Sequence, residues 1–73
     1  MSDVRAPSVG RVLEILVAVG DAVAAGQEVA VVESMKVEIP VTVERAGTVQ
    51  AVAVAVGATV RAGDVLLTLV DTA

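Results

Sequence analysis

Hydrophobic and polar residues alternate with a period of two along most of this chain. Residues 12–17 place three side chains on each face of such an alternation, and residues 52–56 place valine on one face and alanine on the other. Valine fits a pleated strand, whereas in a helix its branched side chain loses χ1 freedom. Glycine and proline interrupt these runs at short intervals, which is typical of short strands joined by tight turns. The pattern therefore predicts an all-β fold.

The sequence also repeats itself at an offset of 37 positions. The shared skeleton is G-x-V, then V-A-V-G, then V-x-A-G, and the two halves cover residues 10–34 and 47–71. Three glycines recur in register, so both halves are expected to make the same turns. Neither half can bury an apolar face alone. We expect two antiparallel sheets that cover each other about a pseudo-two-fold axis, as a flattened barrel or sandwich.

The two halves differ around residues 33–39, where the first half continues past a turn and the second half ends; the repeat partner of Lys36 is Ala73. The predicted strand runs 29–32 and 37–43 meet at Met35 and Lys36. A two-residue turn there pairs Ser34 with Val37 and Glu33 with Glu38. Tight hairpins prefer Asn-Gly or Asp-Gly at these positions, so Met-Lys is locally unfavourable. We interpret this as an indication that the side chains of Met35 and Lys36 serve a function. Pro40 is expected at a sheet edge or bulge.

Length and composition exclude several classes of protein. The chain has 73 residues, enough for one small domain, and it contains no histidine, cysteine or aromatic residue. It therefore lacks imidazole bases, thiolates and the usual zinc ligands, and we expect no metal site and no catalytic centre. Without aromatic stacking platforms and with a net charge of −4, it is not expected to bind nucleic acid.

The chain is also not expected to enter a membrane or a secretory pathway. Its longest apolar stretches fall short of the roughly 20 residues that a spanning helix requires. The first residues contain no cationic and apolar export signal. We therefore expect a monomeric domain in the cytoplasm.

Lys36 is the only lysine, since the other four basic residues are arginines. A single primary amine on an exposed turn suits a chemistry that must acylate one amine and no other. The plainer interpretation, which composition alone favours, is a solvated surface lysine in a turn.

Residues 33–40, Glu-Ser-Met-Lys-Val-Glu-Ile-Pro, resemble the attachment signature of biotinyl domains, with its Ser-Met-Lys core after a glutamate. Three further blocks resemble that family: residues 20–29, 46–49 and 56–66. The resemblance implies a flattened barrel of two four-stranded antiparallel sheets with the biotinylated lysine, here Lys36, at a hairpin tip. It implies attachment by biotin protein ligase, and an arm that carries carboxybiotin from a biotin carboxylase to a carboxyltransferase.

On this resemblance the chain is a carrier and not an enzyme. Glu33, Ser34, Met35, Val37 and Glu38 are the expected determinants of turn shape and ligase recognition. Val37 replaces the second methionine of most members. Lipoyl domains are similar in fold and use the same lysine position, but in an Asp-Lys-Ala context, so lipoate is the less favoured group. A passive β docking module with an unmodified lysine is the remaining alternative.

Overall fold

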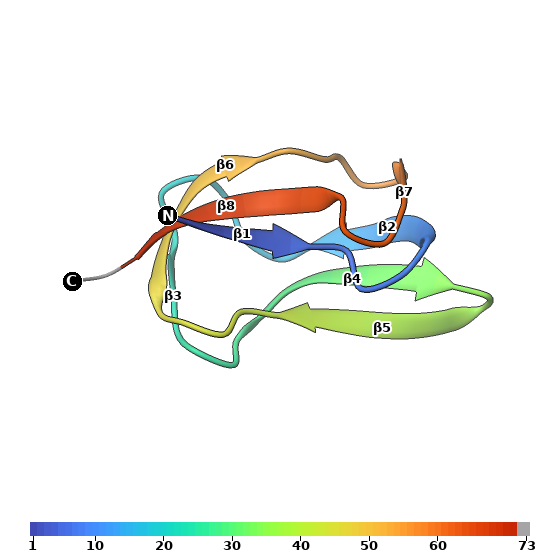
Figure 1. Cartoon of the computed structure of the whole chain (residues 1–73), viewed down its shortest axis with the longest axis horizontal. Coiled ribbons are helices and arrows are strands. Elements are labelled where there is room, and N and C mark those ends of the chain that lie inside the picture. The colour runs from blue at the N-terminus through green and yellow to red at the C-terminus, as the bar shows by residue number, and fades with distance from the viewer. Residues whose placement is uncertain (72–73) are drawn as a thin grey trace.

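Eight strands form two antiparallel four-stranded sheets that face each other in a computed structural model, which describes residues 1–71 (Figure 1). The strands are β1 (Ser2–Arg5), β2 (Gly10–Ile15), β3 (Ala22–Val23), β4 (Glu28–Ser34), β5 (Val37–Thr42), β6 (Gly47–Val52), β7 (Thr59–Val60) and β8 (Val65–Asp71). One sheet has the order β1-β8-β6-β3 and the other β5-β4-β2-β7. The predicted all-β architecture is confirmed. Residues 1–71 include no helix that is long and apolar enough to span a membrane.

The two sheets repeat one pattern of strand pairing. Arg11 of β2 lies opposite Glu33 of β4, and their counterparts 37 positions later, Thr48 and Val70, lie opposite each other in β6 and β8. The short strands β7 and β3 pair with β2 and β6 in the same manner, and β5 and β1 complete the two sheets. The predicted pseudo-two-fold repeat is therefore present in the register itself.

The alternation predicted for residues 12–17 is wrong at one point, because β2 contains a bulge. Its pairing with β4 shifts between Val12 and Glu14. An unpaired residue in a strand reverses the faces of the residues that follow. Val12, before the bulge, is buried, and Ile15, after it, also packs against the core, although simple alternation puts them on opposite faces. Leu16, which alternation places on the same face as Val12, is 47% exposed. A matching shift lies between Val49 and Ala51 in β6.

The run 52–56 follows the predicted alternation only in part. Val52 and Val54 are half-buried against the core and the alanines between and after them are exposed, as expected. The strand itself ends at Val52, however, and Val56 is 62% exposed beside the turn at Gly57.

Aliphatic side chains form the core between the sheets. The most completely buried are Val12, Val29, Val32, Val49, Leu66, Leu67 and Leu69. Burying one such side chain stabilises the fold by about 1.5 to 3 kcal/mol. Two of these residues, Val29 and Leu66, occupy bulges, so that the residue after each of them, Ala30 and Leu67, is buried as well.

The recurring glycines make recurring turns, as predicted. Gly20 and Gly57 have φ of 95° and 92°, and Gly26 and Gly63 have φ of 84° and 90°. This left-handed conformation is open to glycine at little cost. In the turn at Gly63, the Asp64 carboxylate accepts a hydrogen bond of 2.9 Å from the Arg61 amide, which closes the loop.

Candidate functional site

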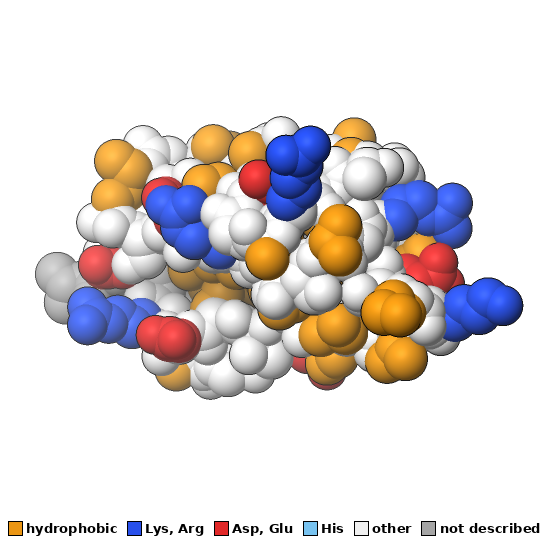
Figure 2. Space-filling model, turned by 45° about the vertical axis from the view of Figure 1, so that its right-hand side comes forward, with side chains coloured by type: hydrophobic (Ala, Val, Ile, Leu, Met, Phe, Trp, Pro, Cys, Tyr) orange, Lys and Arg blue, Asp and Glu red, His pale blue; other side chains and the backbone are white. Residues whose placement is uncertain are grey.

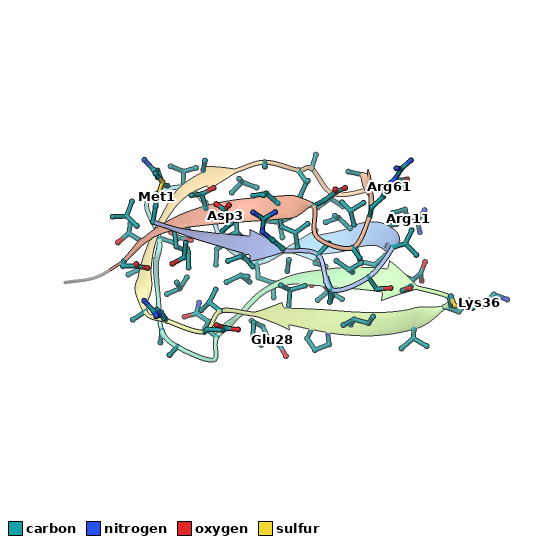
Figure 3. The ribbon with its side chains drawn as sticks, in the orientation of Figure 1. Met1, Asp3, Arg11, Glu28, Lys36 and Arg61 are labelled. Carbon is teal, nitrogen blue, oxygen red and sulfur yellow. The ribbon has the colours of Figure 1, made fainter. Side chains whose placement is uncertain are left out.

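The β4–β5 hairpin projects from one end of the molecule, and Lys36 lies at its tip. Met1 lies at the other end (Figure 3). Ser34 pairs with Val37, and Glu33 pairs with Glu38, which confirms the two-residue turn predicted at Met35 and Lys36. The repeat partner of Lys36, Ala73, lies outside the described residues. Pro40 lies on β5, an edge strand, as expected of a residue without an amide donor.

The turn has an unfavourable backbone. Met35 has φ of 51° and Lys36 φ of 67°, so two adjacent side-chain-bearing residues adopt the left-handed conformation. Each such residue costs on the order of 1 to 2 kcal/mol. Packing does not offset this cost at Met35, whose side chain is 93% exposed. The sequence therefore holds two side chains in the solvent at positions where Asn-Gly would be more stable.

Ser34 differs from the other expected recognition residues because it points inward. It is 9% exposed, and its hydroxyl lies 3.2 Å from the hydroxyl of Ser8 in the β1–β2 loop. A side chain in this position holds the end of β4 against the loop. Glu33, Met35, Val37 and Glu38 remain accessible at the surface. Their role in ligase recognition stays a prediction.

Charges flank the tip on its outer face. Glu33 and Glu38 lie directly opposite each other, where like charges destabilise a strand pair. Arg11 of β2 forms an ion pair of 3.7 Å with Glu33 and partly offsets this repulsion. Such an exposed pair contributes at most about 1 kcal/mol. Among the residues described, Lys36 makes no ion pair, so its amine extends freely into solvent.

Two supports of the tip were not predicted from the sequence. Arg11 is one, and Gly10 is the other, since a Cβ atom at Gly10 would overlap the carbonyl oxygen of Glu33. Gly10 was predicted to form part of the repeat, but the close approach of β2 to β4 was not. The sequence does contain a signal for Arg11: its repeat partner is the uncharged Thr48, so the charge at this position is specific to the half that carries the hairpin.

The arrangement presents a primary amine at the surface. Within residues 1–71, no group of carboxylates is placed to hold a metal ion. The groove between the two edge strands lies at the end opposite the hairpin, lined by β1 and residues 42–45. The chemistry that this tip supports is acylation of the exposed amine of Lys36.

Comparison with known proteins gives a family. The sequence model of a family described as "Biotin-requiring enzyme", biotin_lipoyl, matches residues 2–69. The chain is 47% identical over 64 residues to the biotinylated protein TB7.3 homolog of Mycobacterium leprae, covering 88% of this chain and 90% of that one. It is 45% identical over 64 residues to the biotin carboxyl carrier protein of Streptococcus mutans, covering 88% of this chain and 49% of that protein.

Solved structures agree with the sequence comparison. The crystal structure of the urea carboxylase of Kluyveromyces lactis contains a similar fold, with a TM-score of 0.88 and 33% sequence identity. The match covers 94% of this chain but 6% of the carboxylase. The chain thus spans nearly the whole of one relative, about half of another and a small part of the urea carboxylase.

Proposed function

The chain belongs to the biotin/lipoyl attachment family of biotin-requiring enzymes, and on that premise we propose that Lys36 is the residue that carries biotin. The chain is a biotin carrier domain without catalytic groups of its own. The single observation that supports Lys36 is its place at the tip, where a positive φ and a free amine expose the only lysine of the sequence.

Attachment requires one bond to form and one to break. The neutral amine of Lys36 attacks the carbonyl carbon of biotinyl-adenylate held by biotin protein ligase. A new amide C–N bond forms, the mixed anhydride C–O bond breaks, AMP leaves, and the amine gives up a proton. The modified lysine is uncharged, so the net charge changes from −4 to −5. The free position of Lys36, without an ion-pair partner among the residues described, favours this reaction because no existing contact must be broken.

The attached biotin carries a carboxyl group from a biotin carboxylase to a carboxyltransferase. The small domain supplies the exposed tip and the rigid barrel that holds it. Carboxylase subunits are therefore the partners of this chain, and the biotin carboxylase and carboxyltransferase activities reside in those subunits. Among the proteins that it matches, one is named a biotin carboxyl carrier protein and another is a urea carboxylase.

Lipoate on the same lysine is the alternative group, because the family includes both kinds of domain. Met35 in place of aspartate before Lys36 favours biotin. The intact mass of the protein from its native host separates the possibilities. A biotinyl increment supports the proposal, a lipoyl increment replaces the prosthetic group, and the bare mass favours the unmodified docking module.

Substitution of the lysine tests its role directly. Lys36→Arg keeps the charge and the hairpin but removes the primary amine, and we expect labelling by biotin protein ligase, detected with streptavidin, to be abolished. The matched control is Arg61→Lys combined with Lys36→Arg. This variant places a primary amine at another exposed position, and it should also stay unlabelled. Streptavidin detection of the Lys36→Arg variant would contradict the assignment.

A further inference from the structure

A pair of serines ties the lysine hairpin to a loop that is distant in the sequence. The hydroxyls of Ser8, in the β1–β2 loop, and Ser34, the last residue of β4, lie 3.2 Å apart. Within residues 1–71, Ser34 is the one polar residue among the buried side chains, and it is 9% exposed. A buried hydroxyl without a partner costs free energy, so the inward position of Ser34 depends on the contact with Ser8.

The contact lies where strand pairing no longer supports the hairpin. The register of β2 with β4 ends at the pair Arg11 and Glu33, so Ser34 and the turn that follows it extend past β2. On its other side the hairpin has no neighbouring strand within residues 1–71, because β5 is the edge of its sheet. Beyond the last pair with β2, the hydroxyl of Ser34 is therefore what connects the hairpin to another segment.

The turn that follows Ser34 is strained and receives little packing of its own. Met35 and Lys36 adopt φ of 51° and 67°, and such strain persists only where the surrounding structure fixes it. The Met35 side chain is 93% exposed. Figure 2, which brings this end of the molecule forward, shows hydrophobic and basic side chains at its surface. The constraint must come from the residues that flank the turn, and of these Ser34 is buried whereas Val37 is 59% exposed.

The internal repeat provides a comparison for this contact. The residues equivalent to Ser8 and Ser34, 37 positions later, are Arg45 and Asp71. These two form no ion pair with each other within residues 1–71, and both line a groove of about 560 Å³. Asp71 instead accepts a hydrogen bond of 2.8 Å from Ser2. The end without the lysine therefore lacks the contact that closes the hairpin end.

We propose, on the basis of the proposed function, that Ser8 is a positioning residue for the biotinylation of Lys36. Its hydroxyl holds Ser34 and thereby keeps the strained turn in the conformation that presents the amine. The strain leaves this conformation little margin, so the loss of one hydrogen bond makes the turn mobile. A ligase that binds only the presented conformation then meets a smaller competent fraction. Its KM for the carrier rises, while kcat for the bound carrier is unchanged.

NMR relaxation of the backbone amides in the unmodified protein tests the first step. Ser8→Ala removes the hydroxyl, and we expect the order parameters of residues 35–37 to fall from about 0.85, typical of rigid backbone, toward about 0.6. The order parameters of β8 should stay at the wild-type values. This readout does not depend on biotin, and a contribution of Ser8 to overall stability alone would not change it.

The kinetics of biotinylation by purified ligase test the second step. We expect Ser8→Ala to raise KM for the carrier about two- to tenfold, the factor that corresponds to one hydrogen bond, and to leave kcat unchanged. Ser8→Thr keeps a hydroxyl and should restore the wild-type KM. Ser34→Ala removes the same bond from the other side, and it serves if Ser8→Ala does not fold. The double variant should be no worse than Ser34→Ala alone, because the two hydroxyls act through each other.

Ser2→Ala is the matched control. Ser2 is half-buried, as Ser8 is, and its hydroxyl donates to Asp71 at the end opposite the hairpin. The substitution removes the same group and one hydrogen bond, but it leaves the contact between Ser8 and Ser34 in place. We expect this variant to keep the wild-type mobility of the turn and the wild-type KM.

The outcomes separate the two proposals. Equal turn mobility and equal KM for the Ser8→Ala and Ser2→Ala variants would overturn the positioning role and leave Lys36 as the attachment site. A lower melting temperature of Ser8→Ala with an unchanged turn and KM would overturn it too, since the contact would then serve stability alone. Failure of the wild-type chain to accept biotin would overturn the proposed function, whereas a mobile turn in Ser8→Ala would still show that Ser8 holds the hairpin.

Discussion

The two ends of this barrel share one strand pairing and are completed differently. At the hairpin end, Ser34 is followed by a turn that carries Met35 and Lys36 into solvent. At the other end, the repeat partner of Ser34 is Asp71, and the neighbouring strand β1 begins near it without a connecting turn. The scaffold is thus duplicated, while the exposed amine is not. The difference teaches that the proposed attachment site lies where the symmetry of the chain is broken.

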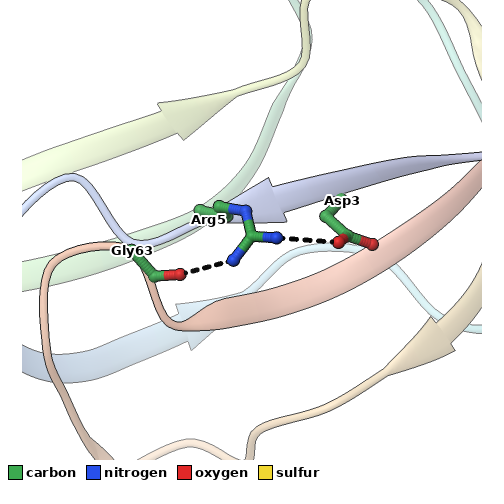
Figure 4. A network of polar contacts seen from close by, with 3 residues as sticks. All are labelled: Asp3, Arg5 and Gly63. Atoms are coloured by element: carbon green, nitrogen blue, oxygen red, sulfur yellow. Dashed lines mark hydrogen bonds and ion pairs between the residues drawn. The ribbon is translucent and has the colours of Figure 1, made fainter.

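Polar contacts follow the same division. At the hairpin end, Ser8 and Ser34 meet 3.2 Å apart in a partly buried contact that leaves the tip side chains free. At the opposite end, polar side chains bond to one another on the surface, as Ser2 does to Asp71 at 2.8 Å. Along β1, the Arg5 guanidinium donates to the Gly63 carbonyl and to Asp3 (Figure 4). The hairpin end therefore has a partly buried contact in addition to its surface ion pair between Arg11 and Glu33, whereas the contact between Ser2 and Asp71 lies at the surface.

The largest effect should come from the two glycines that allow each half to close. A Cβ atom at Gly47 would lie 2.6 Å from the Val70 carbonyl oxygen, and one at Gly10 would overlap the equivalent oxygen of Glu33. We expect Gly10→Ala and Gly47→Ala each to lower the free energy of unfolding by about 2 to 3 kcal/mol, because backbone must move. Urea unfolding measures both.

These two substitutions should also differ in their effect on biotinylation, because Gly10 lies at the hairpin end and Gly47 at the opposite end. Gly10→Ala displaces the end of β4 beside Ser34, so we expect it to slow biotinylation under conditions where the variant is folded. Gly47→Ala acts at the other end and should leave the rate of labelling unchanged. Equal rates for the two folded variants would show that the attachment hairpin does not depend on its own support.

The second effect concerns the backbone of the turn. Met35→Asn should raise the free energy of unfolding by about 1 kcal/mol, because asparagine tolerates the left-handed conformation better than methionine. Met35→Ala removes the same side chain but keeps a poorly suited residue, and it should leave the stability nearly unchanged. Thermal unfolding of the three proteins provides the comparison. A Met35→Asn variant no more stable than Met35→Ala would mean that the turn carries no backbone cost.

Much of this structure could be predicted from the sequence because the signals are local. The valine alternation, the recurring glycines and the Met-Lys turn each depend on residues close together in the chain, and the register of Ser34 with Val37 followed from turn length alone. Contacts between distant segments could not be predicted in this way. The bulge after Val12, the inward position of Ser34 and the pairing of Arg11 with Glu33 depend on which strands become neighbours.

The smallest effect should be a pH dependence that arises from Asp71, at the end that lacks the lysine. The hydrogen bond from Ser2 lowers the pKa of Asp71, and the charges of the terminal amine and Arg45 act in the same direction. A carboxyl group with a lowered pKa in the folded state stabilises the fold above its unfolded pKa, near about pH 4, and this contribution is lost as the pH falls through the folded value. At the hairpin end, the uncharged Ser34 occupies the equivalent position and adds no such dependence.

Asp71→Asn should therefore make the free energy of unfolding fall less steeply with pH below about pH 4, whereas Ser34→Ala should leave the slope unchanged. Unfolding in urea at a series of pH values measures both slopes, and equal slopes for the wild type and the Asp71→Asn variant would show that the surface contacts of Asp71 contribute nothing to stability.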